Sequence, residues 1–414
     1  MTSATFVFAW ELGGGLGHAA RIKPLAQELL RRGHRVRLIL RDLAGVAEVL
    51  NDLAVPKLQA PVYQLKTMGL LQPQASLAEI LLANGYLQAG HLGAQIDGWL
   101  SAFECCGATA VIGDYAPSAV LAARIAGLPT ATVGIGFYMP PEIQPIPTFR
   151  DWEAIPAARI AHAETQVLTS VNTVLARHGC APVEALWRLY SGDRPLLCTW
   201  PEFDHYSRQN RPDNKKADQT WWGPTFLSST GQDSAESNPA WPVGTGPRVF
   251  AYLKAGHPDH ALWLQALVDK GCRVLCYLPE VATGKPAPVR SAAIHYAKRP
   301  INIGALMPSC ELMVCHAGEA TLTQGLLAGV PLLLLPMQPE QFLMARGVAR
   351  STGAAINASE HPRPTPMKAL LAQLLDTPLM RDKARAFAAR YAGFSNAEQT
   401  RQLVDQFEAM LPAP

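Results

Sequence analysis

The sequence has little of several features that mark particular protein classes. Charged residues make up 17% of the chain, and 36 Lys and Arg against 33 Asp and Glu leave a net charge of +3. With no basic run longer than two residues, this composition excludes the footprint of a nucleic-acid-binding protein. The eight cysteines are scattered and form no Cys-x-x-Cys pair, which predicts reduced cysteines in a cytoplasmic protein.

Long hydrophobic runs and clustered metal ligands are missing as well. The longest apolar stretch, around "LLAGVPLLLLPM", is broken by Pro331 and Pro336 and cannot span a bilayer. The opening "MTSATFVFAW" lacks the basic region of a secretory signal. No Asp-x-Asp occurs, so we expect no metal site and no cofactor. These absences predict a soluble protein, for which peripheral contact with a membrane stays open.

What is present is one pattern that occurs twice. Residues 5–40 predict a strand "TFVFAW", a glycine-rich turn, a helix, Gly33 and a second strand, and residues 248–278 repeat that order around Gly271. Each glycine stands where a helix ends and a β-rich run begins. Short apolar strands alternating with amphipathic helices predict parallel sheets covered on both faces. We therefore expect an α/β protein with two Rossmann-like, doubly wound domains facing across a cleft.

The domain limits follow from a change in composition. The segment "LSSTGQDSAESNPAWPVGTGP", residues 227–247, is rich in Ser, Gly and Pro and has no periodicity, as is typical of a linker. It separates an N-terminal domain, 1–226, from a C-terminal domain, 248–414. Residues 378–411 have helical spacing, and the last helix, about 385–411, is a candidate to pack back on the N-terminal domain.

Candidate site residues cluster in the stretch "VCHAGEATLTQGLLAGVPLLLLPMQPEQ", residues 314–341. It predicts a strand, a turn and a helix that begins near Glu319, and ligands of parallel sheets bind at such strand ends. The amino end of the helix suits a phosphate, with His316, Gly318 and Thr321 beside it. The next strand returns Glu340 and Gln341 to the same edge, where they can bind a polyol. A histidine that only ends a strand, with a glycine that only turns the chain, is the alternative.

The first glycine-rich turn, "GGGLGHAARIKPL", places His18 where the first strand meets its helix. It resembles a dinucleotide-binding fingerprint superficially, but His18 stands in place of the third glycine and the motif alone is weak. Asp114 ends another apolar strand before a helix that begins near Pro117. A role for Asp114 as a helix cap, and for His18 as a capping or core residue, stays open at this stage.

Together these stretches resemble the UDP-glycosyltransferase superfamily of GT-B glycosyltransferases, which includes plant and macrolide-modifying members. The likeness of 314–341 to the donor-binding signature has no gaps, and the two-domain layout extends it over almost the whole chain. It implies that His316 and the turn Gly318, Glu319, Ala320 and Thr321 hold the diphosphate of a nucleotide sugar. It also implies that Glu340 and Gln341 bind the sugar hydroxyls.

The resemblance further implies that His18 is a general base and Asp114 its partner, because Gly17 and His18 match the family's Gly-His turn. Two departures affect the donor. Gln324 stands where the family often has a glutamate for the ribose, and "AKRPINIGALM" replaces the Trp-x-x-Gln that opens the plant signature. The nucleotide, of UDP or dTDP type, and the sugar are therefore not specified by the motif.

The reaction expected from this resemblance is a metal-free, inverting transfer of a sugar to a hydroxyl. The acceptor would be a hydrophobic small molecule or lipid, bound by the loops around 62–100 and 136–150. Two alternatives stay open. A nucleotide-sugar hydrolase or epimerase would use water or an internal hydroxyl, and a non-catalytic subunit would bind the sugar nucleotide without turnover.

Overall fold

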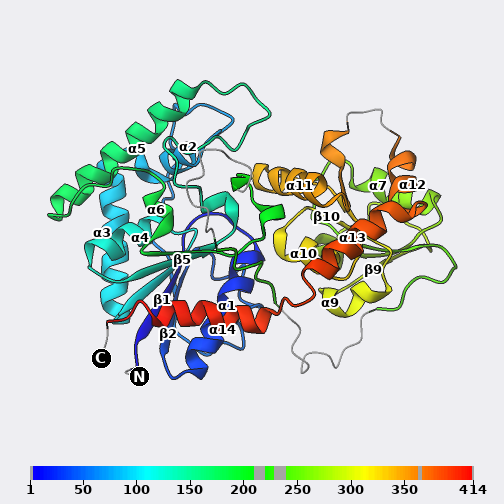
Figure 1. Ribbon diagram of the computed structural model, residues 1–414, viewed down its shortest axis with the longest axis horizontal. Helices are drawn as coiled ribbons and strands as arrows, with labels where there is room; N and C mark the ends of the chain where they lie inside the picture. The colour runs from blue at the N-terminus through cyan, green and yellow to red at the C-terminus, as the bar shows by residue number, and fades with distance from the viewer. Residues whose placement is uncertain (1–2, 209–219, 228–238, 362–365, 413–414) are drawn as a thin grey trace. The chain divides into compact units, whose positions relative to one another are not determined.

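A computed structural model describes residues 3–208, 220–227, 239–361 and 366–412 (Figure 1). The chain divides into two compact units, one formed by Met1–Thr225 with Ser395–Pro414 and the other by Phe226–Phe394. The expected C-terminal domain, 248–414, therefore differs from the second unit at both ends. Residues 228–238 of the expected linker lie outside the described residues.

The first unit is built on a six-stranded parallel sheet in the order β3-β2-β1-β4-β5-β6. Three of its strands are buried at every position, as expected for a sheet covered on both faces. Its strands and helices are β1 (Thr5–Trp10), α1 (Leu16–Arg31), β2 (Arg35–Leu40), β3 (Lys57–Gln59), α2 (Leu77–Leu81), η1 (Leu82–Tyr86), α3 (Ala89–Cys106), β4 (Ala110–Asp114), α4 (Pro117–Ile125), β5 (Thr130–Gly134), η2 (Gly136–Tyr138), α5 (Ala157–Arg177), α6 (Arg188–Ser191), β6 (Arg194–Leu197), η3 (Pro201–Phe203) and α14 (Asn396–Glu408).

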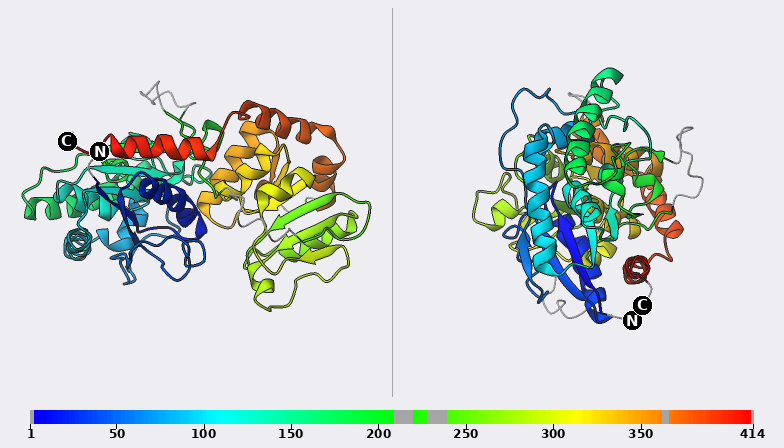
Figure 2. Two further views of the ribbon diagram at one scale, coloured as in Figure 1. Left: turned by 90° about the horizontal axis from the view of Figure 1, so that it is seen from below. Right: turned by 90° about the vertical axis from the view of Figure 1, so that its left-hand side faces the viewer.

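Helix α14 completes the core of the first unit although it comes from the end of the chain. It runs alongside α1 in Figures 1 and 2. Phe407 meets Phe8 of β1 edge to face, with ring centroids 6.3 Å apart. Arg32 donates from its Nη1 to Asp405 and Glu408, at 2.6 Å each. Apolar burial and ion pairs therefore assign this helix to the first unit.

The second unit has a six-stranded parallel sheet in the order β12-β11-β10-β7-β8-β9. Its core gathers apolar side chains of the central strands and of the helices that cover them. Its elements are β7 (Arg248–Tyr252), α7 (His260–Asp269), β8 (Arg273–Tyr277), α8 (Pro279–Ala282), β9 (Ile294–Tyr296), α9 (Ile303–Leu306), η6 (Met307–Ser309), β10 (Leu312–Cys315), α10 (Glu319–Leu327), β11 (Leu332–Leu334), α11 (Pro339–Thr352), β12 (Ala355–Asn357), η7 (Ala358–Glu360), α12 (Met367–Leu375) and α13 (Pro378–Arg390).

The helical run expected over 378–411 is two helices. α13 ends at Arg390 and α14 begins at Asn396, after a short segment that contains Gly393. The side chain of Ser395 caps α14 by accepting a hydrogen bond from the backbone N–H of Glu398, at 3.4 Å. A serine followed three residues later by a glutamate is a capping-box sequence, and it starts a new helix here.

Both sheets have the same winding, which fixes where their ligands bind. In each, the first strand of the unit lies next to the fourth, so the chain builds one side of the sheet and then the other. The prediction of two doubly wound parallel-sheet domains is thereby confirmed. Ligands of such sheets bind beyond the carboxyl ends of the strands where the winding reverses. These switch points lie between β1 and β4 in the first unit and between β7 and β10 in the second.

Candidate functional site

His18 and Asp114 meet at the switch point of the first unit. Asp114 is the last residue of β4 and His18 lies in the first turn of α1, which follows β1. The His18 Nδ1 is 3.1 Å from the Asp114 Oδ1, within the distance of an ion pair. In this rotamer the ring N–H does not meet the geometry of a hydrogen bond. His18 is 8% exposed and Asp114 1%, so the pair is largely shielded from water.

Two further side chains hold the Asp114 carboxylate. Arg21 donates from its Nη1 to both carboxylate oxygens, at 3.2 and 3.1 Å, and to the Tyr138 hydroxyl at 2.7 Å. Tyr138 in turn donates to Asp114 Oδ1 at 2.7 Å. Burial alone would raise the pKa of Asp114, but the positive charges of His18 and Arg21 outweigh it and lower the pKa below its usual 3.8. Asp114 therefore stays an anion at neutral pH.

The glycine-rich turn gives the His18 ring its space. Gly13 has a φ of +75°, and a Cβ added there would lie 3.0 Å from His18 Nε2. The imidazole also stacks on Trp10 of β1, with ring centroids 4.8 Å apart and planes at 20°. Tyr115, directly after Asp114, has a φ of +51°, a costly conformation for a bulky residue that often marks functional sites.

The structure excludes the alternative that Asp114 is the cap of α4. The N-cap of that helix is Ala116, and its side chain makes no capping bond. The carboxylate that meets the amino end of α4 belongs to Glu11, which accepts from the backbone N–H of Ser118 at 2.8 Å and from its hydroxyl at 2.6 Å. Asp114 is thus available to His18 and Arg21.

Arg21 and Tyr138 are absent from the sequence-based site. Arg21 follows His18 by three residues on α1, so the spacing alone places both on one face of the helix. That spacing is a usable signal for Arg21. Tyr138 lies beyond β5 in η2, inside the 136–150 loop that we assigned to the acceptor, and no local pattern connects it to Asp114.

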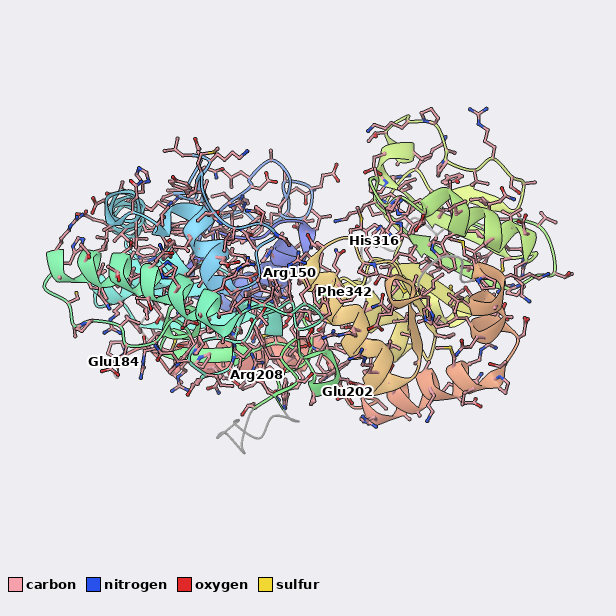
Figure 3. All side chains as sticks on the ribbon, turned by 90° about the horizontal axis from the view of Figure 1, so that it is seen from above. Arg150, Glu184, Glu202, Arg208, His316 and Phe342 are labelled. Atoms are coloured by element: carbon pink, nitrogen blue, oxygen red, sulfur yellow. The ribbon has the colours of Figure 1, made fainter. Side chains whose placement is uncertain are left out.

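His316 lies at the switch point of the second unit, directly after β10 (Figure 3). Its Nδ1 is 2.6 Å from the backbone oxygen of Leu335, and its Nε2 is 2.8 Å from the backbone nitrogen of Lys254. Nδ1 must carry the proton, because Nε2 accepts from an N–H. Burial, together with His257 and Lys254, lowers the pKa of His316. The ring is a neutral brace between the chain segments that follow β7 and β11. Both of its nitrogens are used by backbone groups, so His316 supports the phosphate turn and does not itself donate to the diphosphate as the resemblance implies.

The remaining residues of the donor motif surround the amino end of α10. Gly318 is the N-cap and Glu319 the first helical residue, and the preceding Ala317 has a φ of +61°. Thr321 lies in the first turn, half-buried, and its N–H donates to the Gly318 oxygen at 3.0 Å. Ala320 accepts from the side chain of Gln324 at 2.9 Å. The chain thus places a helix amino end at the switch point, as the phosphate prediction requires.

Glu340 and Gln341 lie in the first turn of α11, beyond the end of β11. β11 pairs with β10, so both residues stand at the same edge of the sheet as His316. The Gln341 Oε1 accepts from the backbone N–H of Met337 at 3.0 Å. Gln338 donates to Glu340 Oε2 at 3.3 Å. Both predicted sugar-binding side chains are half-buried and take part in the local bonding of this turn.

Neither a metal-binding cluster nor a membrane-spanning helix occurs among the described residues. Among them no group of three or more His, Cys, Asp or Glu side chains is arranged to hold a metal ion. Within the same ranges, no helix combines the length and the apolar character needed to cross a bilayer.

Comparisons with known proteins point to one class of enzyme. No protein-family model matches the sequence. The chain is 31% identical over 141 residues to the elloramycin glycosyltransferase ElmGT of Streptomyces olivaceus, a match that spans 31% of this chain and only 35% of that relative. It is also 23% identical over 303 residues to a PGL/p-HBAD biosynthesis glycosyltransferase of Mycobacterium tuberculosis. That match spans 69% of this chain and 68% of the relative.

Solved structures extend the likeness over the whole chain. A kitacinnamycin glycosyltransferase superposes with a TM-score of 0.66 and 17% identity, covering 99% of both chains. The spinosyn rhamnosyltransferase SpnG complexed with thymidine diphosphate superposes with a TM-score of 0.64 and 15% identity, covering 97% of this chain and 99% of that one. At such identities the likeness concerns the fold. The chain has the GT-B fold that these glycosyltransferases share.

Proposed function

We propose that this protein is a metal-independent, inverting glycosyltransferase that moves a sugar from a nucleotide-diphosphate sugar to a hydroxyl group. The observation that carries the proposal is the buried pair of His18 and Asp114 at the switch point of the first unit. A histidine beside a buried carboxylate is the arrangement that removes a proton from a hydroxyl near neutral pH.

His18 is the general base of the proposed reaction. Its Nδ1 faces Asp114, so its Nε2, on the side of the Gly13 turn, is the atom that takes the acceptor's proton. The Asp114 anion then stabilises the imidazolium and keeps the proton on Nδ1 of the resting ring. The acceptor oxygen attacks the anomeric carbon in line and the nucleotide diphosphate leaves, so the sugar configuration inverts.

Arg21 and Tyr138 act through Asp114. Their hydrogen bonds fix the carboxylate and keep it ionised. The charge of Arg21 also means that the carboxylate does not stand alone in a buried site when His18 is neutral. We therefore assign both as positioning residues.

The donor is assigned to the second unit. The amino end of α10, with Gly318, Glu319, Ala320 and Thr321, offers N–H groups and a partial positive charge to the diphosphate. His316 braces this turn, and Glu340 and Gln341 bind hydroxyls of the sugar. No metal is required, because helix and backbone groups supply the charge that neutralises the phosphates. Gln324 is assigned to the ribose.

Named relatives support the class of ligand. VinC is a glycosyltransferase solved in complex with dTDP, and SpnG was solved with a spinosyn aglycone as well as with thymidine diphosphate. By that likeness the donor here is of UDP or dTDP type. The acceptor is a hydrophobic small molecule or lipid, which fits the buried aromatic residues Phe137, Tyr138 and Phe149 in the 136–150 loop.

The test is an assay of the purified chain with UDP- and dTDP-sugars and a panel of hydrophobic alcohols and phenols. Transfer with release of nucleotide diphosphate, and a product whose anomeric configuration is opposite to that of the donor by NMR, is the expected result. Release at an equal rate without any acceptor would instead indicate a hydrolase. Donor binding by calorimetry without turnover on any acceptor would indicate a non-catalytic subunit.

A further inference from the structure

Three histidine rings meet at the switch point of the second unit. The rings of His257 and His260 are stacked, with centroids 5.1 Å apart, and the His316 centroid lies 5.9 Å from the first and 5.2 Å from the second. His257 belongs to the turn after β7 and His260 is the first residue of α7, whereas His316 follows β10. Only His316 has a role in the function proposed above.

The three rings differ in how their nitrogens are used. Both nitrogens of His316 are engaged by backbone groups, as described above, and the His257 Nδ1 accepts from the backbone N–H of Asp259 at 3.1 Å. The Nε2 of His260 is buried and has no hydrogen-bond partner among the described residues. His260 is only 7% exposed. A buried polar atom without a partner costs free energy, and it calls for an explanation.

The position of His260 suggests what its partner is. α7 has ten residues, and the ring of His260, its first residue, contacts the ring of His316, which lies three residues before the first residue of α10. His260 therefore stands at the amino end of α7 and beside the turn that leads into α10, at the switch point of the sheet, a place that favours an anion. A protonated imidazole can donate a charge-assisted hydrogen bond to an anion, which is stronger than a bond between neutral groups.

The charged and titratable groups facing His260 come from each element around it. His257 precedes it, His316 follows β10, and Glu280 lies on α8 with one oxygen accepting from the backbone of the β7 turn at 3.1 Å. Lys254, after β7, acts on the neighbouring His316. Burial lowers the pKa of His260 to about 4, with help from His316 and His257 and against the opposing effect of Glu280. Without a ligand the ring is neutral at physiological pH.

We propose that His260 binds the diphosphate of the sugar nucleotide as an imidazolium, taking one proton from solvent when the ligand binds. This inference rests on the proposed function, since it names a further group at the donor site. His257 packs against the ring and limits its rotation, and His316 stays neutral because its Nε2 faces an N–H donor. The proton offsets part of the charge that a metal ion would otherwise neutralise.

The sign of the pH dependence follows from the charge. An anion within hydrogen-bond distance raises the pKa of a histidine by about 1–3 units. The diphosphate carries two negative charges, so we expect a rise of about 2–3 units from about 4, which puts the pKa of the bound form at about 6 to 7. Between the free and bound values, affinity falls as the pH rises. Affinity for a sugar nucleotide at pH 7.5 is expected to be weaker than at pH 5.5 by about fourfold if the bound pKa is near 6, and by about twentyfold if it is near 7.

The experiment is isothermal titration of the full chain with dTDP-glucose and UDP-glucose at pH 5.5 in three buffers of different ionisation enthalpy. A diphosphate esterified at both ends does not itself take up a proton at this pH. The slope of the observed enthalpy against the buffer enthalpy counts the protons bound. The expected slope is about 0.7 to 1 proton, and a slope of zero with binding intact overturns the proposal.

Variants assign the proton to a ring. His260→Asn should remove the proton uptake and the pH dependence of affinity, while His295→Asn, at an exposed position of β9 in the same sheet, should keep both. Uptake that persists in His260→Asn and disappears in His257→Asn overturns the assignment to His260. If His260→Asn does not fold, the imidazole carbon shifts of the wild type, titrated with and without dTDP-glucose, decide whether a cluster histidine changes its pKa. Failure of the wild type to bind any sugar nucleotide would count against the proposed function instead.

Discussion

His18 and Asp114 stand 3.1 Å apart and are expected to act as one unit. His18→Ala should lower the rate of transfer about 10²–10⁴-fold, the usual contribution of a general base, with little change in donor affinity. Asp114→Asn should also lower the rate, and the double variant should lose much less than the product of the two single effects. Steady-state kinetics of the three variants tests this, and fully multiplicative losses would show that the two residues do not work as a pair.

The Asp114 variant needs a stability control. Arg21 is 5% exposed and donates to Asp114, so an asparagine leaves a buried cation without its anion, a change that destabilises proteins. Urea unfolding measured beside the kinetics separates this loss from the loss of catalysis.

Glu11 gives a pH-dependent contribution to stability. Burial raises the pKa of its carboxyl from 4.5 to about 7, against the lowering effect of its hydrogen bonds with Ser118. Between these values the folded state holds a proton that the unfolded state has released, so stability falls as the pH rises from about 4.5 to 7. Glu11→Gln should remove this component, worth about 3 kcal/mol at most. Denaturant midpoints across pH 4.5–8 would show it, with Glu184→Gln as an exposed control (Figure 3).

At the scale of the elements, the local pattern of the sequence predicts the helices and strands, but it does not predict the long-range contacts between them. β1, α1, β4 and α4 lie where alternation and turn residues predict them, because these signals are local. The same signals bring His18 and Asp114 to one sheet edge. They carry no information about the bond from Tyr138 to Asp114 or the ring contact between His260 and His316. Such contacts depend on strand order, which only the folded chain shows.

The position of α14 likewise depends on long-range contacts that the local sequence pattern does not show. Its amphipathic spacing predicts a helix, and its apolar residues need a partner, but the spacing does not identify which sheet supplies one. Its burial against β1 and α1 separates Ser395–Pro414 from the sequence neighbours that form the second unit.

The two ends of the donor motif are expected to act on different parts of the ligand. His316→Ala removes a brace with two backbone hydrogen bonds. Because the loosened turn carries the phosphate site, the variant should weaken binding of both the nucleotide sugar and the free nucleotide diphosphate, by no more than about 3 kcal/mol. Glu340→Ala should weaken the nucleotide sugar and spare the free diphosphate, which has no sugar hydroxyls. Calorimetry of both ligands with both variants tests this. Equal losses for both ligands in Glu340→Ala would contradict the orientation proposed.

For the molecule as a whole, the proposed reaction predicts that metal chelators do not change the rate of transfer. Helix amino ends and backbone groups neutralise the diphosphate, so EDTA should leave the transfer rate essentially unchanged. The measurement is the initial rate after dialysis against EDTA, with and without added Mg²⁺ or Mn²⁺. Complete loss that either ion restores would overturn the metal-free mechanism.

The division into two units predicts that their stabilities can be changed separately. Phe407 is fully buried against Phe8 in the first unit, so Phe407→Ala should destabilise that unit by about 3–5 kcal/mol. The matched control is Phe387→Ala, which removes a buried ring from α13 in the second unit. Hydrogen exchange followed by mass spectrometry reports each unit by its own peptides. Phe407→Ala should accelerate exchange in β1 and β2, while β7 and β10 keep their protection and dTDP-glucose binds as before. Phe387→Ala should accelerate exchange in β7 and β10 and leave β1 and β2 protected. Equal acceleration in both sheets by Phe407→Ala would show that α14 supports the whole chain as one cooperative body.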